Sequence, residues 1–249
     1  RLNNQLLNKE IELASTIQSG FWPKEQPMIA NYKVAGCSIP AKNVGGDYFD
    51  YISLPNKNNW GFTVADVTGK GVSAALLMAT MRASLRSHLE YSNTPNISLT
   101  KVNELIFNDS PLDKFITAIY CELDSIKNTI RYVNAGHNNP YVLDVEKNSI
   151  STLDVGGLML GILDTVKYDE EVYEIKSNQK LILYSDGITE ARDVKGDFYG
   201  EKRFENWLLD NKTLDPDAMV KGITEELIHF RNEAEQSDDI TIIVIQRVG

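Results

Sequence analysis

The sequence predicts a single α+β domain preceded by an N-terminal helix. Period-2 alternation at 115–124 and 129–134 is typical of the two strands of a hairpin, and the segments 72–90 and 216–234 have helical spacing. No composition shift marks a flexible linker within the 249 residues, and 42% hydrophobic content is enough for one large core. The formal charge of −10 argues against a general nucleic-acid or anionic-membrane surface, because such partners call for clustered Lys and Arg.

Residues 1–19 form the predicted N-terminal helix, which carries two apolar stripes. One stripe consists of Leu2, Leu6, Leu13 and Ile17, and the other of Leu7, Ile11 and Ala14. Two interpretations stay open: a wide face that packs on its own domain, or a stripe that pairs with a partner helix in a dimer or signalling linker. Pro23 and Pro27 end the helix, because proline disfavours helical geometry in the residue before it.

The N-terminus of the chain and its two cysteines bear on what precedes the domain and on its cellular compartment. Because the chain begins at Arg1 inside a helical pattern, we expect it to come from a longer protein with an upstream domain or membrane anchor. Neither a signal peptide nor a membrane span is recognisable, so we expect a cytoplasmic location. Cys37 and Cys121 lie far apart in apolar runs, which favours two buried, unreactive thiols over a disulfide.

Acidic residues recur at the ends of predicted strands, beside glycines or other acids. They are Asp47, after two glycines; Asp66, at the end of a strand over 60–65 and before the turn with Gly69 and Gly71; Asp186, at the end of a strand over 180–185; and Asp238 with Asp239, before a strand over 240–246. Carboxylates gathered at one end of a sheet would repel one another unless cations lay between them, and oxygen ligands suit Mg²⁺ or Mn²⁺. The alternative is that these four acidic positions are unrelated turns.

The remaining elements carry weaker signals. The helix over 72–90 has a broad apolar face and a small smooth one, and we expect both to be packed. Shorter helices are expected over 99–108 and 201–209. His137 lies in a loop with Gly, Asn and Pro, where it is either a ligand or acid-base group, or a histidine that bonds to backbone. The glycines of 156–161 do not have dinucleotide-binding spacing, and no helix follows them, so we predict a packed loop.

Five motifs in order resemble one family. VGGDYFD (44–50), ADVTGKGVSAAL (65–76), NAGHN (134–138), YSDGITEA (184–191) and SDDIT (237–241) are similar to the bacterial SpoIIE/RsbU-type branch of the metal-dependent Ser/Thr protein phosphatases. The resemblance covers about 28–247. It implies a linker helix over 1–27, which also provides a possible dimer contact, and a phosphatase domain over 28–249. The fold implied is a four-layer αββα sandwich of two mainly antiparallel sheets flanked by helices.

The resemblance also implies a centre of two Mn²⁺ or Mg²⁺ ions. Asp66 would bridge both ions. Asp186 and Asp238 would complete one site, with Asp239 as the alternative to Asp238, and Asp47 with the Val67 carbonyl would serve the other. Asp50 is a candidate for supporting the ligands without binding an ion itself. A water activated by both ions would hydrolyse the phosphoserine or phosphothreonine of a regulatory protein, of the anti-sigma-factor antagonist type. The general acid stays open, because Val67 and Thr68 follow Asp66 where eukaryotic members have Gly and His.

Two other function classes are compatible with parts of the sequence. A catalytically silent signalling and dimerisation module would use the N-terminal helix and the small face of the helix over 72–90, but it would not need the complete acidic set. A metal-dependent nuclease or cyclic-nucleotide phosphodiesterase fits the acids but not the charge of −10. We expect the intact protein to dimerise through the N-terminal helix, and the orientation of this helix to be passed to the helix over 72–90, whose first residues neighbour Asp66.

Overall fold

The computed structural model describes residues 2–56, 58–91, 94–111 and 113–249. Within these ranges the helices are α1 (Leu2–Ser19), α2 (Val72–Tyr91), α3 (Pro95–Asp109), α4 (Glu201–Asp210) and α5 (Pro216–Arg231). The strands are β1 (Tyr32–Ile39), β2 (Tyr48–Ser53), β3 (Asn59–Val67), β4 (Ile116–Asp124), β5 (Thr129–Ala135), β6 (Tyr141–Asp144), β7 (Ser149–Thr152), β8 (Glu171–Glu174), β9 (Gln179–Tyr184) and β10 (Ile240–Arg247).

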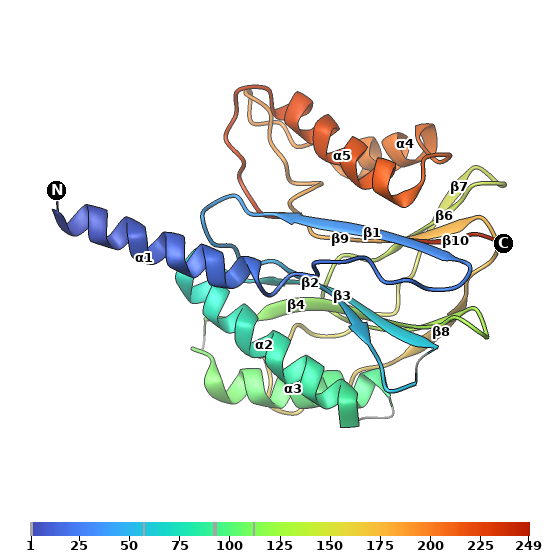
Figure 1. Cartoon of the computed structure of the whole chain (residues 1–249), viewed down its shortest axis with the longest axis horizontal. Coiled ribbons are helices and arrows are strands. Elements are labelled where there is room, and N and C mark those ends of the chain that lie inside the picture. The colour runs from blue at the N-terminus through green and yellow to red at the C-terminus, as the bar shows by residue number, and fades with distance from the viewer. Residues whose placement is uncertain (1, 57, 92–93, 112) are drawn as a thin grey trace.

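The strands form two antiparallel sheets that stack face to face. One sheet has the order β1-β10-β9-β6-β7, and the other has the order β2-β3-β4-β5-β8. Helices α4 and α5 cover the outer face of the first sheet, while α2 and α3 cover the outer face of the second (Figure 1). This is the predicted four-layer αββα sandwich.

Three apolar cores lie between the four layers. Side chains of each strand alternate between the two faces of its sheet, so each sheet packs against the other sheet on one face and against helices on the other. Val34, Phe62 and Ile243 belong to the core between the sheets. Met78 and Leu99 anchor the core beneath α2 and α3. Phe204, Leu208, Met219 and Ile223 belong to the core beneath α4 and α5. Cys121 is buried in the central core and Cys37 is partly exposed, so the prediction of two buried thiols holds for Cys121 alone; both thiols are free.

The helix α2 is buried on one face only, which corrects the expectation that both faces are packed. Met78, Met81 and Leu85 are buried against the second sheet and α3. Val72 and Leu76, on the opposite face, are 45% and 65% exposed. The helix belongs to an outer layer, so one side of its first turns faces solvent.

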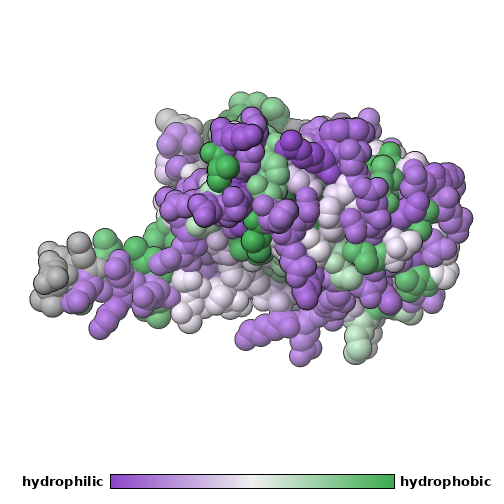
Figure 2. Space-filling view, turned by 90° about the horizontal axis from the view of Figure 1, so that it is seen from above, coloured by the Kyte–Doolittle hydropathy of each residue, from purple (hydrophilic) through white to green (hydrophobic). Residues whose placement is uncertain are grey.

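The helix α1 extends away from the sandwich as an arm with apolar residues along it (Figures 1 and 2). Leu6, Leu13 and Ile17, from the first predicted stripe, are each more than half exposed, and so is Leu7 from the second. The side chain of Leu2, which completes the first stripe, lies outside the described residues. The interpretation in which a wide face packs on its own domain therefore does not hold for these leucines, while pairing with a partner helix stays a prediction.

Several element boundaries differ from the sequence prediction. The helix α3 begins at Pro95 rather than at 99, and α5 ends at Arg231 because Asn232 adopts a φ of 52°. The short edge strands β7 and β8 were not predicted from the sequence. Among the residues that the structure describes, no helix is both long and apolar enough to cross a bilayer.

Candidate metal centre

The predicted acidic positions meet at one end of the sandwich. Pairing of Tyr48 with Ala65 places the start of β2 beside the end of β3, and pairing of Ile242 with Tyr184 places the start of β10 beside the end of β9. The two sheets are joined here, because the Thr241 hydroxyl of one sheet donates to Asp47 of the other at 2.5 Å. The interpretation as four unrelated turn residues therefore fails.

Asp66 and Asp47 are the most strongly perturbed acids of this group. Burial raises the pKa of Asp66 to about 7, and the nearby carboxylates of Asp186 and Asp238 add to that rise. Burial also raises the pKa of Asp47 well above its ordinary value, with further contributions from Asp66 and Asp239. Burial and mutual repulsion thus disfavour the charged forms of these carboxylates.

Asp186 extends the same group from the end of β9. Burial raises its pKa to about 6, and the charges of Asp238 and Glu190 contribute, while Lys70 acts in the opposite direction. Asp66, Asp186 and Asp238 are therefore close enough to interact electrostatically, as the sequence-based assignment to one site requires.

The adjacent acids Asp238 and Asp239 have different environments. Asp239 is buried, and its carboxylate accepts hydrogen bonds from the backbone N–H groups of Ala41 at 2.7 Å and Gly46 at 2.8 Å. The Asp238 carboxylate is half exposed and pairs with the Lys70 ammonium at 3.0 Å. Asp239 thus braces the glycine loop, which leaves Asp238 as the better candidate ligand.

The residues fit a cation-binding centre, although no ready-made ligand set is present. Among the described ranges, no three carboxylate, imidazole or thiol groups are already arranged to hold a metal ion. The donors nevertheless suit a hard cation: carboxylates that repel one another, and the Val67 carbonyl, which lies 2.8 Å from where a Cβ on Gly46 would stand. The Lys70 ammonium pairs with the carboxylate of Asp238, one of these candidate ligands, at 3.0 Å.

Two further sequence candidates, Asp50 and His137, are bound by protein partners of their own. Asp50 is fully buried and is held by Arg86 of α2 through two bonds of 2.6 and 2.7 Å, with Tyr48 as a third donor. It fastens α2 to β2, and its support of the ligands stays a prediction. His137 is also buried: Nδ1 bonds the Thr117 hydroxyl at 2.8 Å, and burial lowers the pKa of the imidazole to about 4.

Sequence reasoning missed two residues that contact the acidic region. Gln18, in the last turn of α1, donates to the Gly45 carbonyl at 2.7 Å and accepts from the Gly45 N–H at 3.0 Å. Lys70 reaches Asp238 across 168 positions of sequence. Lys70 had a usable signal, because it is a cation between two glycines directly after Asp66; Gln18 had none, since its partner is backbone.

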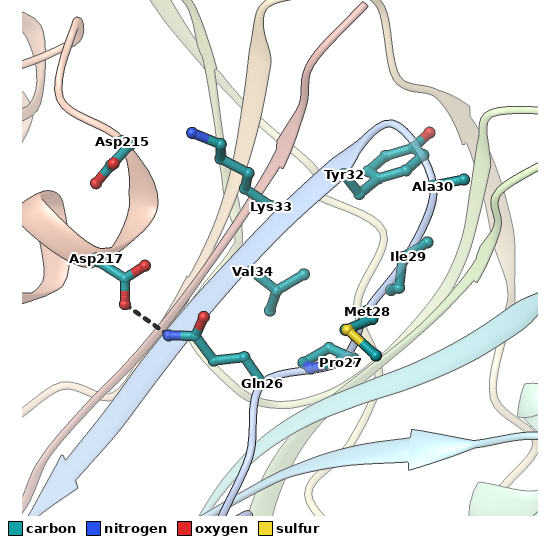
Figure 3. A pocket seen from close by; sticks show the side chains of 10 residues that line it. All are labelled: Gln26, Pro27, Met28, Ile29, Ala30, Tyr32, Lys33, Val34, Asp215 and Asp217. Atoms are coloured by element: carbon teal, nitrogen blue, oxygen red, sulfur yellow. Dashed lines mark hydrogen bonds between the residues drawn. The ribbon is translucent and has the colours of Figure 1, made fainter.

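A groove lies elsewhere on the molecule, between the segment after α1 and the start of α5 (Figure 3). It encloses about 680 Å³ and is lined by Gln26, Met28, Lys33, Asp215 and Asp217 among others. The Gln26 amide donates to Asp217 at 2.5 Å, which ties the linker segment to α5. None of the predicted ligands lines this groove.

An αββα sandwich with carboxylates at the joined ends of its two sheets defines the PP2C type of phosphatase fold. The family model for Stage II sporulation protein E (SpoIIE) matches residues 56–248, so the chain belongs to the SpoIIE family of PP2C-type phosphatases. It is similar to the phosphoserine phosphatase RsbU of Bacillus subtilis (strain 168), with 28% identity over 243 residues, covering 98% of this chain and 71% of that protein.

Two solved structures share the fold. The SiaA-PP2C domain of Pseudomonas aeruginosa superposes with a TM-score of 0.86 at 21% identity and covers 98% of both chains. RsbX in complex with magnesium superposes with a TM-score of 0.65 at 16% identity, covering 89% of this chain and 98% of the other. The chain spans only 26–57% of the length of four further curated relatives that it matches.

Proposed function

We propose that this chain is a metal-dependent protein serine/threonine phosphatase that hydrolyses a phosphomonoester on a regulatory protein. The observation that carries the proposal is the convergence of Asp47, Asp66, Asp186 and Asp238 at one end of the sandwich, with Asp66 and Asp47 raised in pKa by burial and mutual repulsion. SpoIIE-family membership and the similarity to a phosphoserine phosphatase support it.

In the proposed centre, Asp66 would be a ligand of both ions. Asp186 and Asp238 would serve one ion, and Asp47 with the Val67 carbonyl would serve the other, while Asp239 holds the glycine loop in place. Divalent ions of this kind lower the pKa of water and neutralise charge on phosphoryl oxygens. Mn²⁺ and Mg²⁺ both suit the oxygen donors, and the magnesium in RsbX is in line with this.

The chain's own residues prepare this chemistry. Thr241 orients the Asp47 carboxylate, and the two-bond contact between Gln18 and Gly45 fixes the loop just before Asp47. Burial of Asp47 and Asp66 keeps bulk water from screening their charges, so cations bind there more strongly than at exposed acids.

The substrate and regulation are the finer parts of the proposal. The similarity to a phosphoserine phosphatase supports a phosphoserine substrate. The motif resemblance to SpoIIE/RsbU-type phosphatases makes a phosphorylated regulatory protein the substrate class, with an anti-sigma-factor antagonist as the first candidate. Residues 1–27 would act as a linker that dimerises through Leu6, Leu13 and Ile17, because these side chains are exposed along α1. Residues 28–249 would form the phosphatase domain.

Phosphate release from a phosphoserine peptide tests the proposal, measured for the purified chain over a range of Mn²⁺ concentrations. We expect Mn²⁺-dependent hydrolysis that falls at least a hundred-fold in Asp66→Asn, as loss of a bridging ligand would require. Asp164→Asn, a change at an exposed loop acid, is the matched control and should keep full activity. An inactive wild type would instead favour a catalytically silent module, and equal activity in wild type and Asp66→Asn would show that Asp66 does not take part in hydrolysis.

A further inference from the structure

The turn that follows Asp66 directs a lysine at a predicted metal ligand. Gly69 and Gly71 both have positive φ, 93° and 81°, which residues with a side chain rarely adopt. The turn between them carries Lys70 to the start of β10. There its ammonium pairs with Asp238 Oδ2 at 3.0 Å and donates to the Ser237 carbonyl.

This ion pair has little value as a structural bond. The side chains of Lys70 and Asp238 are 39% and 36% exposed, so solvent screens their attraction and the net contribution to folding is small. The pair has a larger consequence for cation binding. An ammonium at this distance neutralises the Asp238 carboxylate and repels any second cation, so Lys70 and a divalent ion compete for the same ligand.

A second lysine lies on the other side of the turn. The Thr68 N–H donates to the Phe115 carbonyl, and the Phe115 N–H donates to the Thr68 hydroxyl, both at 3.0 Å. These bonds hold Lys114 against the turn: a Cβ at Gly69 would stand 2.8 Å from its ammonium nitrogen. Two cationic side chains therefore border the acidic group, in a chain whose formal charge is −10.

The same turn leads into α2, a 20-residue helix without an acid in its first turn. The N-terminus of a long helix favours negative charge, because its first N–H groups have no partner within the helix. The two lysine ammonium groups and the N-terminus of α2 together supply positive charge beside the acids, and this charge attracts a phosphoryl dianion.

We propose that Lys70 has two successive partners: it holds Asp238 before the metal ions bind, and it binds a phosphoryl oxygen of the substrate once they have displaced it from Asp238. The inference rests on the proposed function. It gives Lys70 the task of the phosphate-binding cation. The released ammonium stays on the Gly69–Gly71 turn, beside the ligand that it has left.

Lys70→Met tests both halves of the proposal without measuring hydrolysis. Mn²⁺ is titrated calorimetrically into the whole chain, and inorganic phosphate is then titrated into the Mn²⁺-saturated protein. We expect Lys70→Met to bind Mn²⁺ at least three-fold more tightly, because a competing cation is gone, and phosphate about ten-fold more weakly, because a charge-assisted bond is lost. Lys70→Arg keeps the charge and should retain most of the phosphate affinity.

Lys101→Met is the matched control, because Lys101 forms an ion pair of similar exposure with Glu104 on α3. It should change neither affinity. Unchanged or weaker Mn²⁺ binding in Lys70→Met overturns the proposal, and so does unchanged phosphate binding. If the wild type hydrolyses no phosphoserine peptide, the proposed function fails, but the two titrations still decide the role of Lys70.

Discussion

The ion pair between Asp50 and Arg86 is expected to be a large single contribution to stability. Asp50 is fully buried in β2, and Arg86 of α2 binds both of its carboxylate oxygens. In Arg86→Met the carboxylate would keep the Tyr48 hydroxyl but lose its counter-ion. Removing one partner of a buried pair costs about 3–5 kcal/mol. Because the Arg86 side chain is 40% exposed and partly screened, we expect the lower end, about 3 kcal/mol.

Thermal unfolding measures this effect. A loss of about 3 kcal/mol should lower Tm by roughly 6–12 °C for a domain of this size. The double variant Asp50→Asn with Arg86→Met should recover most of the loss, since no unpaired charge then stays buried. Lys202→Met, which opens an exposed pair with Glu205, should change Tm by less than about 2 °C. A loss below about 1 kcal/mol in Arg86→Met, or a double variant as unstable as the single one, would refute the reasoning.

Three further predictions concern the loop and the cores. Gln18→Ala should destabilise the chain by about 2 kcal/mol in urea unfolding, because two buried backbone groups of Gly45 lose their partners. Gln5→Ala, on the exposed part of α1, should be neutral. Equal effects of the two changes would contradict the role of Gln18 in holding Gly45. Gly46→Ala should weaken Mn²⁺ binding in calorimetry, because its Cβ would stand 2.8 Å from the Val67 carbonyl; unchanged affinity would separate that carbonyl from the metal centre. Burial lowers the pKa of His137 from 6.5 to about 4. As the pH falls below 6.5, the unfolded chain therefore takes up a proton before the folded chain does. The folded state loses up to about 3 kcal/mol of stability by pH 4. Against His137→Asn, the wild type should lose that much more stability between pH 7 and 4, and parallel pH profiles would show that His137 does not titrate as expected.

Much of the site could be predicted because its signals are local. The strand that ends in Asp66, the turn with two glycines and the helix α2 follow one another in the chain, and each has its own pattern. The acids at the other strand ends repeat the same arrangement. Their convergence was confirmed by the strand pairing, whereas the metal ions they would hold stay a prediction.

The remainder depended on tertiary contacts that no local pattern encodes. The resemblance marked Asp50 as a supporting acid, but no local pattern indicates its partner, Arg86, which lies 36 residues further along the chain in α2. Strands β7 and β8 have few apolar residues and are largely exposed, so only pairing with a neighbouring strand defines them. The exposed face of α2 was misjudged because helical spacing gives the apolar stripes but not what covers them.

The most direct test of the central claim is the number of Mn²⁺ ions that the chain binds in a calorimetric titration. The proposed centre predicts two ions for the wild type and for Asp164→Asn. It predicts one ion for Asp186→Asn, because Asp186 serves only one of the two positions. No binding by the wild type at millimolar Mn²⁺, or the same stoichiometry and affinity in Asp186→Asn, would contradict the account.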